Sequence, residues 1–129
     1  MKKYLLIDDE EIFNFIQSEV IKLNESSDEI IMFSSAKEAL DYIIDLINHN
    51  LQLPQFILLD IRMPNMSGFD FLDKLMTFDP DLFKQTKIYL LSSSIDERDT
   101  KKAKNYPLVA GFKGKPLSEE IIKDINKTE

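Results

Sequence analysis

The stretch Phe56-Ile57-Leu58-Leu59-Asp60-Ile61-Arg62-Met63-Pro64 decides the fold. Its first four residues form a continuous apolar run, which is typical of a parallel strand that is buried on both faces. An aspartate follows this run directly. In an open parallel sheet the residues just past the carboxyl ends of the strands gather at one edge, where α/β proteins bind ligands. The stretch therefore predicts a buried strand that delivers a carboxylate to the ligand-binding edge of a sheet.

Two other short apolar runs also end in charged residues. Tyr4 to Ile7 is followed by Asp8 and Asp9, and Leu108 to Phe112 is followed closely by Lys115. If all three runs are parallel strands, three carboxylates and one ammonium meet in a single crevice. That combination is poor for a hydrophobic core and well suited to holding a metal ion and a phosphoryl group.

The rest of the chain alternates between strand and helix patterns from end to end, which predicts an α/β fold. We expect a doubly wound, five-stranded parallel sheet with helices on both faces. The expected strands lie near residues 4–7, 29–33, 56–59, 87–91 and 108–112.

The helices are expected from apolar residues at helical spacing and from capping residues. The first helix is expected to bury one face, formed by Ile12, Ile16, Val20 and Leu23. Ser35 and Glu38 have capping-box spacing at the start of the second helix, and Ser67 can cap the third. A polar fourth helix, capped by Asp96, is expected over residues 97–105 with Ala103 as its main apolar anchor. The last helix is expected to bury Leu117, Ile121, Ile122 and Ile125.

Composition narrows the function classes. The 129 residues are 43% hydrophobic and 30% charged, without repeats or linkers, so we expect one domain over residues 1–129 and no separate output domain. A net charge of −7 argues against direct nucleic-acid binding. No apolar run approaches the roughly 20 residues that a membrane span needs. The absence of cysteine fits a reducing cytoplasm.

The acidic residues themselves point to a divalent cation. Asp8 and Asp9 alone could simply cap the next helix. Asp60 at the end of a buried strand, with two more carboxylates nearby, would carry a desolvation cost and like-charge repulsion. Mg²⁺ resolves this conflict, since it accepts carboxylate oxygens and keeps waters that a phosphate can displace. Lys115 can pair with a carboxylate at rest and with a phosphoryl oxygen afterwards, and Ser92 offers a hydroxyl from the end of the fourth strand.

Taken together, these motifs resemble the receiver domain of bacterial two-component response regulators, of the stand-alone, chemotaxis-regulator-like type. The resemblance covers essentially the full chain. It rests on the Asp8-Asp9 pair, on an Asp-x-x-Met-Pro-x-Met-x-Gly run from Asp60 to Gly68, on Ser92, and on Lys115-Pro116. The sequence departs from the family in a longer second crossover near residues 49–54, in a serine at position 92, where threonine is more frequent, and in a serine at position 93, where a slightly smaller residue is usual.

The resemblance implies a strand order of 2-1-3-4-5, as in flavodoxin, and a cis bond between Lys115 and Pro116. It also assigns roles to residues. Asp60 would be the phosphoacceptor; Asp9 would bind Mg²⁺ directly, Asp8 would bind it through water, and the carbonyl of Arg62 would complete the protein ligands. Lys115 would hold the phosphoryl group, and Ser92 and Phe112 would be the switch residues.

The same resemblance implies a regulator that assists its own phosphorylation and dephosphorylation rather than an enzyme. A sensor histidine kinase or a histidine phosphotransfer protein would supply the phosphoryl group. A downstream protein would bind the face formed by the fourth helix, the fifth strand and the fifth helix. An alternative is an aspartate-nucleophile, Mg²⁺-dependent phosphatase, but that chemistry needs an acid two positions after the nucleophile, where Arg62 stands. A terminal regulator and a phosphorelay shuttle look alike at this level.

Overall fold

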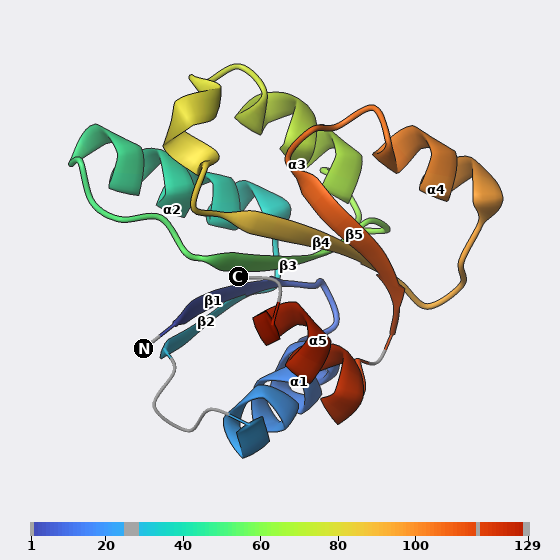
Figure 1. Cartoon of the computed structure of the whole chain (residues 1–129). Coiled ribbons are helices and arrows are strands. Elements are labelled where there is room, and N and C mark those ends of the chain that lie inside the picture. The colour runs from blue at the N-terminus through green and yellow to red at the C-terminus, as the bar shows by residue number, and fades with distance from the viewer. Residues whose placement is uncertain (1, 25–28, 116, 128–129) are drawn as a thin grey trace.

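The structure is a computed structural model that describes residues 2–24, 29–115 and 117–127. These residues alternate between strand and helix, as the sequence predicts (Figure 1). In chain order the elements are β1 (Lys3–Ile7), α1 (Glu11–Asn24), β2 (Glu29–Phe33), α2 (Ala36–Asn48), β3 (Phe56–Asp60), α3 (Gly68–Leu75), the 3-10 helix η1 (Pro80–Phe83), β4 (Lys87–Ser92), α4 (Glu97–Ala103), β5 (Val109–Gly114) and α5 (Glu119–Lys127).

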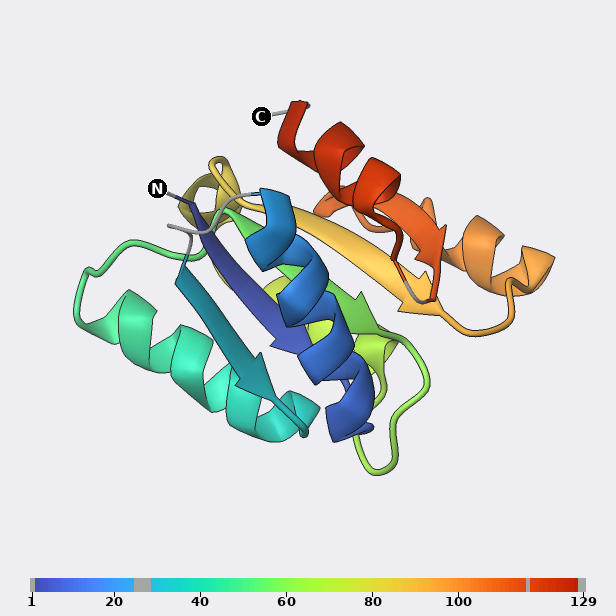
Figure 2. The same cartoon turned by 90° about the horizontal axis from the view of Figure 1, so that it is seen from below.

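The strands of the described residues form one parallel sheet in the order β2-β1-β3-β4-β5, which confirms the expected fold. Helices α2, α3 and α4 cover one face of the sheet, and α1 and α5 cover the other (Figures 1 and 2). Among the described residues, none of the helices combines the length and apolarity that a membrane crossing requires.

Strand β3 lies at the centre of the sheet, and all five of its residues are buried. Its side chains alternate between the two faces. Ile57 and Leu59 join the core under α2 and α3, whereas Phe56 and Leu58 join the core under α1 and α5. A strand with cores on both sides needs apolar residues at every position. This explains why the run from Phe56 to Leu59 has no alternation.

The register of the strands aligns the ends that carry the polar residues. Ile7 of β1 pairs with Leu59 of β3, so the residues that follow these two lie side by side. On the other side of β3, Asp60 pairs with Leu91 of β4. Ser92, the last residue of β4, pairs with Gly114 of β5. The carboxyl ends of four strands therefore meet at one edge.

The expected helix caps are present. Ser67 and Asp70 form a full capping box at the start of α3, and Asp96 accepts a hydrogen bond from the N–H of Arg98 at the start of α4. The Ser35 side chain accepts from the N–H of Glu38 at the start of α2. These contacts satisfy backbone donors that the first turn of a helix leaves unpaired.

The predicted buried face of α1 was wrong. Ile12, Ile16 and Leu23 are 64%, 38% and 74% exposed, and Val20 is only partly buried. The side of α1 that faces the protein instead carries Asn14, Gln17, Ser18 and Ile21, all of which are buried.

A hydrogen-bonded anchor gives the physical reason for this rotation. The Asn14 amide donates to the carbonyl of Asp8 at 3.1 Å and to the carbonyl of Phe33 at 3.0 Å, which ties α1 to the ends of β1 and β2. Residues three, four and seven positions after Asn14 then also face inward. Tertiary contacts have overridden the apolar spacing.

The last third of the chain departs from expectation only in its boundaries. Leu117, predicted to lie in the last helix, precedes α5, which begins at Glu119. Ala103 is the buried residue of α4, whose helical residues end there rather than at Asn105. Strand β5 begins and ends later than predicted, at Val109–Gly114. Leu117, Ile122 and Ile125 are buried, and Ile121 is partly buried against the same core.

Candidate functional site

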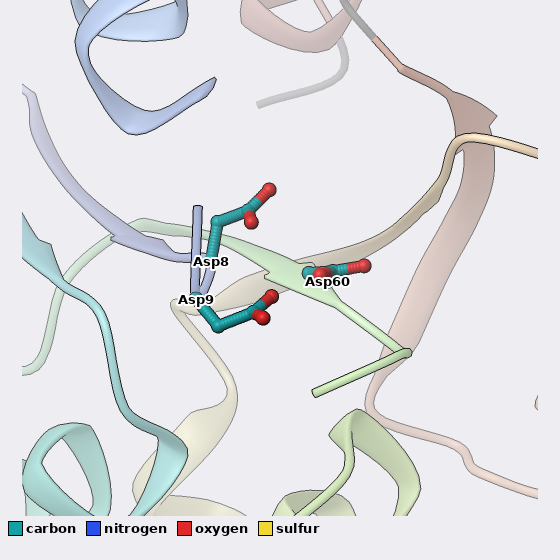
Figure 3. Close-up of side chains that lie close together, drawn as sticks. All are labelled: Asp8, Asp9 and Asp60. Atoms are coloured by element: carbon teal, nitrogen blue, oxygen red, sulfur yellow. The ribbon is translucent and has the colours of Figure 1, made fainter. Parts of the chain in front are cut away.

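The carboxylates of Asp8, Asp9 and Asp60 converge at the carboxyl edge of the sheet (Figure 3). One ligand oxygen from each lies within 4.8 Å of the others. Asp8 and Asp60 are buried, with 1% and 3% of their surface exposed, whereas Asp9 is exposed. Two buried acids and one exposed acid leave the group open to solvent on one side.

Lys115 is the positive charge of this site. Its Nζ lies 2.9 Å from Asp8 Oδ2 and 3.5 Å from Asp60 Oδ2, and its side chain is 3% exposed. The Lys115 N–H also donates to the carbonyl of Ser92 at 2.8 Å, which fixes the start of the loop after β5. At rest, therefore, the lysine is closer to Asp8 than to Asp60.

Burial raises the pKa of Asp60 to about 6, and the negative charge of Asp8 adds to the rise. The positive charge of Lys115 and the N–H of Arg62, which donates to Asp60 Oδ1 at 3.3 Å, oppose it. For Lys115, burial works to lower the pKa, but the hydrogen bond to Asp8 and the charges of Asp60 and Asp8 outweigh it and raise the pKa. Among the described residues, the site thus contains more buried negative charge than the ammonium of Lys115 compensates.

The loop after Asp60 approaches the strand end closely at Gly68. Its N–H donates to the carbonyl of Ile61 at 3.1 Å. A Cβ at this position would lie 2.7 Å from the carbonyl oxygen of Asp60 and 2.8 Å from the Cα of Ile61. The glycine of the Asp-x-x-Met-Pro-x-Met-x-Gly run is therefore required by sterics, because any side chain would displace the backbone of Asp60.

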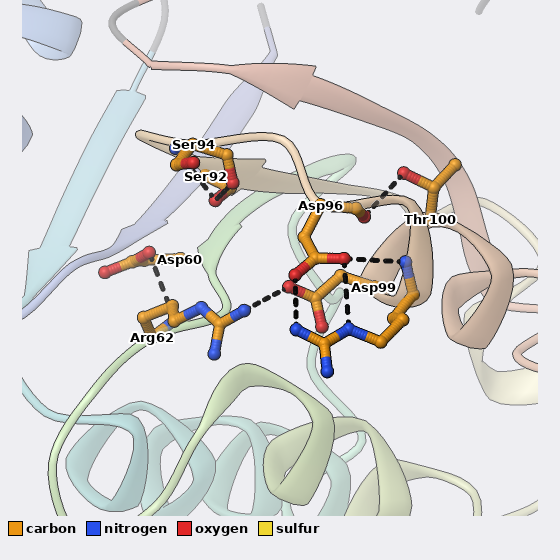
Figure 4. Close-up of polar contacts among 8 residues, drawn as sticks. Asp60, Arg62, Ser92, Ser94, Asp96, Asp99 and Thr100 are labelled. Carbon is orange, nitrogen blue, oxygen red and sulfur yellow. Dashed lines mark hydrogen bonds and ion pairs between the residues drawn. The ribbon is translucent and has the colours of Figure 1, made fainter.

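Among the described residues, the hydrogen bonds of the Ser92 side chain go to Ser94 and not to Asp60. The Ser92 hydroxyl donates to the carbonyl of Ser94 at 2.6 Å and accepts from the N–H of Ser94 at 3.2 Å (Figure 4). The side chain is 2% exposed and closes a small turn at the end of β4. Movement toward Asp60 would require this turn to open.

Arg62 links the site to α4. Its guanidinium extends away from Asp60 and pairs with Asp99, with Nη2 and Oδ2 2.5 Å apart (Figure 4). Asp99 belongs to α4, and Asp96 at the start of that helix pairs with Arg98 at 3.0 Å. Phe112, the other residue predicted to be a switch, is partly buried and lines a hollow together with Thr100, Ala103 and Lys104 of the α4 region.

The structure therefore brings together Asp8, Asp9, Asp60 and Lys115, as predicted, and places Ser92 and Arg62 beside them. The peptide bond between Lys115 and Pro116, predicted to be cis, involves a residue outside the described ones. Phe13 was not predicted to belong to the site, yet its ring centroid lies 4.4 Å from Lys115 Nζ. One indication of this contact lies in the position of Phe13 along the chain. Phe13 follows Asp9 by four residues, which places it in the first turn of α1, next to the acidic pair.

The profile of the response regulator receiver domain family matches residues 4–126. The chain belongs to this family. It is a receiver domain, the phosphoacceptor signalling domain of two-component systems, and this family consists of signalling regulators rather than classical enzymes. No curated protein sequence matches it significantly.

Solved structures agree with this assignment. A two-component response regulator from Cytophaga hutchinsonii is 28% identical, with a TM-score of 0.89 over 98% of this chain and 94% of the other. A two-component response regulator from Legionella pneumophila is 25% identical, with a TM-score of 0.81; the match covers 99% of this chain and 97% of that one. The Mn²⁺-bound form of response regulator Rcp1 shares the fold at 23% identity, with a TM-score of 0.75 over 100% and 92%.

Proposed function

We propose that Asp60 of this receiver domain accepts a phosphoryl group from a phosphohistidine, and that Lys115 and a Mg²⁺ ion neutralise the charge of the transferred group. The observation that carries the proposal is the site itself. A buried carboxylate at a strand end lies 3.5 Å from a buried ammonium and within 4.8 Å of two further carboxylates. If the pair of Lys115 and Asp60 served only to stabilise the fold, it would not need the further carboxylates of Asp8 and Asp9.

The residues fit a hard divalent cation. Three carboxylates with one open side match the oxygen ligands and retained waters of Mg²⁺. Asp9 and Asp60 would hold the ion directly, Asp8 would hold it through water, and the carbonyl of Arg62 would complete the protein ligands. Response regulator Rcp1, which shares this fold, is known in a Mn²⁺-bound form, and this supports a divalent ion as the ligand of the three carboxylates. When bound, the ion supplies positive charge that offsets the charge of the phosphoryl oxygens.

In the transfer, the bond between the donor nitrogen and phosphorus breaks, and a bond between phosphorus and a carboxylate oxygen of Asp60 forms. Such a reaction needs mainly positioning and charge neutralisation. Lys115 moves from Asp8 toward a phosphoryl oxygen, a short displacement because its Nζ already lies 3.5 Å from a carboxylate oxygen of Asp60. Ser92 then leaves its turn with Ser94 and donates its hydroxyl to the phosphoryl group.

The described residues offer no support for the phosphatase alternative. The position two residues after Asp60 holds Arg62, whose guanidinium pairs with Asp99 and cannot act as a general acid. We therefore propose a regulator that assists its own phosphorylation and dephosphorylation.

The exposed apolar stripe of α1, formed by Ile12, Ile16 and Leu23, supports the proposed kinase or phosphotransfer partner. It lies on the helix that begins three residues after Asp8. Large apolar side chains that stay exposed along one helix offer surface that a partner protein can bury. The donor, a sensor histidine kinase or a histidine phosphotransfer protein, would dock here in the cytoplasm.

Output is proposed to pass through the face formed by α4, β5 and α5 to a downstream protein, without direct contact to nucleic acid or membrane. Within residues 1–129 we propose one receiver domain and no output domain. The ion pair between Arg62 and Asp99 connects the loop that follows Asp60 to α4.

The first test is covalent labelling. Incubation with acetyl phosphate and Mg²⁺ should add one phosphoryl group to the protein, measured by intact mass, and EDTA should prevent it. Asp60→Asn should take up none, whereas Asp41→Asn, which alters an exposed acid of α2, should label normally. Equal labelling of the Asp60→Asn variant would contradict the proposal.

Metal binding should be visible as thermal stabilisation. Millimolar Mg²⁺ should raise the melting temperature, because the ion binds the folded protein in preference to the unfolded chain. Asp9→Ala should raise the melting temperature of the metal-free protein, since the charge of Asp9 opposes ionisation of Asp60, and should reduce the Mg²⁺ response. A melting curve that is insensitive to Mg²⁺ would count against the site.

Helix α4 should respond most strongly to phosphorylation. It buries Ala103 and otherwise docks through polar contacts, so it should be weakly held. Hydrogen exchange should show residues 97–103 among the least protected helical residues. Beryllofluoride with Mg²⁺, a phosphoryl mimic, should change the exchange of this segment most. A larger change in α1 or α2 would mean that the output face is misassigned.

A further inference from the structure

Lys115 has an aromatic partner as well as two acidic ones. The ring centroid of Phe13 lies 4.4 Å from Lys115 Nζ, while the same nitrogen contacts Asp8 and Asp60. Phe13 lies in the first turn of α1 and is partly buried. The ammonium is therefore held by carboxylates and by the face of a ring, and its side chain is almost fully withdrawn from water.

The burial of the lysine makes this contact different from a surface one. Lys102 lies at a similar distance, 4.5 Å, from the ring of Phe69, but Lys102 is exposed and stays hydrated. A cation–π contact gains most when the cation is desolvated, where it changes an equilibrium by roughly 5- to 30-fold. Because the Lys115 side chain is only 3% exposed, its contact with Phe13 belongs to the stronger, desolvated class.

The position of the Phe13 ring is set by the hydrogen bonds of Asn14, which also determine which side of α1 faces the protein. The Asn14 amide donates to the carbonyls of Asp8 and Phe33, which sets the rotation of the helix about its axis. Phe13 is the preceding residue, so the same rotation places its ring beside the site. The N–H of Phe13 also donates to the carbonyl of Glu10 at 3.0 Å, which closes the first turn.

We propose that Phe13 is a positioning residue for Lys115. The inference rests on the proposed function, in which Asp8 and Asp60 turn toward a divalent cation and a phosphoryl group. Both carboxylates then become weaker partners for the ammonium. The ring of Phe13 neither binds the cation nor titrates, so it keeps Lys115 in the crevice and ready to meet the phosphoryl oxygen.

A packing role alone predicts something different. If Phe13 only fills space in α1, then Phe13→Leu should cost a little stability and leave phosphorylation unchanged. If the ring face holds the ammonium, an aromatic replacement should preserve the effect and an aliphatic one should not. Phe13→Tyr and Phe13→Leu separate these cases. Phe15→Leu is the matched control, since Phe15 lies on the same helix and is 59% exposed.

The experiment measures the rate of phosphoryl uptake from acetyl phosphate at saturating Mg²⁺. We expect Phe13→Leu to be roughly 3- to 10-fold slower than wild type, and Phe13→Tyr and Phe15→Leu to lie within about twofold of it. The Mg²⁺ midpoint of the thermal shift should be the same in all four proteins. A Phe13→Leu rate equal to that of Phe15→Leu would overturn the proposal, as would equal slowing of the Leu and Tyr variants.

A spectroscopic readout keeps this proposal separable from the proposed function. An aromatic ring face next to Nζ should shift the NMR signals of the Lys115 ε-methylene protons upfield. The shift should persist in Phe13→Tyr and Phe15→Leu and disappear in Phe13→Leu. If wild type takes up no phosphoryl group, the proposed function fails, and the shift still decides whether the ring holds the lysine. A shift that survives in Phe13→Leu rules the contact out.

Discussion

Replacing Asp60 with asparagine should stabilise the metal-free protein at pH 8 by about 2–3 kcal/mol in its free energy of unfolding. The reason is that burial raises the pKa of this carboxyl to about 6, from an ordinary value of 3.8. Each unit of difference between the folded and unfolded pKa corresponds to about 1.4 kcal/mol. Asparagine keeps the shape of the side chain and removes the charge that the fold disfavours.

The pH dependence of this gain has a definite sign. Because the pKa of Asp60 is higher in the folded state, the folded protein binds the proton more tightly than the unfolded chain does. The stability that this carboxyl contributes is fully present below pH 3.8 and is lost as the pH rises through about 6. The gain in free energy of unfolding that Asp60→Asn brings should therefore be small at pH 4. It should grow between pH 4 and about 6 and stay constant at higher pH.

Denaturant unfolding in EDTA, at several pH values between 4 and 8, measures this difference. Asp41→Asn is the control, because Asp41 is exposed and forms only a surface pair with Lys37. Its effect should stay small throughout. If Asp60→Asn gains the same free energy at pH 4 as at pH 8, charge burial at Asp60 is not the cause.

Lys115→Met should have the opposite effect and should also impair phosphorylation. Removing the ammonium leaves Asp8 and Asp60 buried without their cation, and breaking a buried pair in this way costs about 3–5 kcal/mol. The free energy of unfolding of the metal-free protein at pH 8 should fall by about this amount. The loss should be smaller at pH 5, where Asp60 can take up a proton. Phosphoryl uptake should slow by about a hundredfold, on the scale of losing one charge-stabilising donor.

The double variant Lys115→Met with Asp60→Asn tests the cause of the instability. Part of the lost stability should return, because one of the two uncompensated charges has been removed. Lys101→Met is the control, since Lys101 forms an exposed pair with Glu97. If Lys115→Met is no more destabilising than Lys101→Met, the charges of the site are solvated and the electrostatic account is wrong.

Much of the fold could be predicted because local patterns agree with the tertiary structure. The run Phe56 to Leu59 is apolar at every position because both of its faces pack, and it is buried at every position in the structure. Ser67 and Asp96 cap helices because the start of a helix has unpaired donors wherever it lies. Apolar runs and capping residues of this kind can be read from the local sequence alone, without knowing which other segments pack nearby.

The face of α1 could not be predicted in this way. Ile12, Ile16 and Leu23 have the spacing of a buried stripe, yet the contacts that set the rotation of the helix come from the Asn14 amide to backbone carbonyls. An asparagine in a helical segment gives no local indication of such partners. The exposed stripe became interpretable only once the rotation was known.

The same distinction holds for the site. Asp8, Asp60 and Lys115 could be brought together because strand ends share an edge. The ring of Phe13 over Lys115 and the pairing of Arg62 with Asp99 depend on distances between segments far apart in the chain. Neither follows from a motif, and both are links between the site and a neighbouring helix.

The proposal stands or falls on whether the carboxylate of Asp60 is the group that receives phosphorus. Borohydride reduces an acyl phosphate to an alcohol, so treatment of the phosphorylated protein converts the modified aspartate to homoserine. Peptide mapping by mass spectrometry should then find homoserine at position 60 and unmodified aspartate at positions 8 and 9, only after incubation with both acetyl phosphate and Mg²⁺. Homoserine at position 8 or 9, or at no position in a protein whose mass shows the added phosphoryl group, would contradict it.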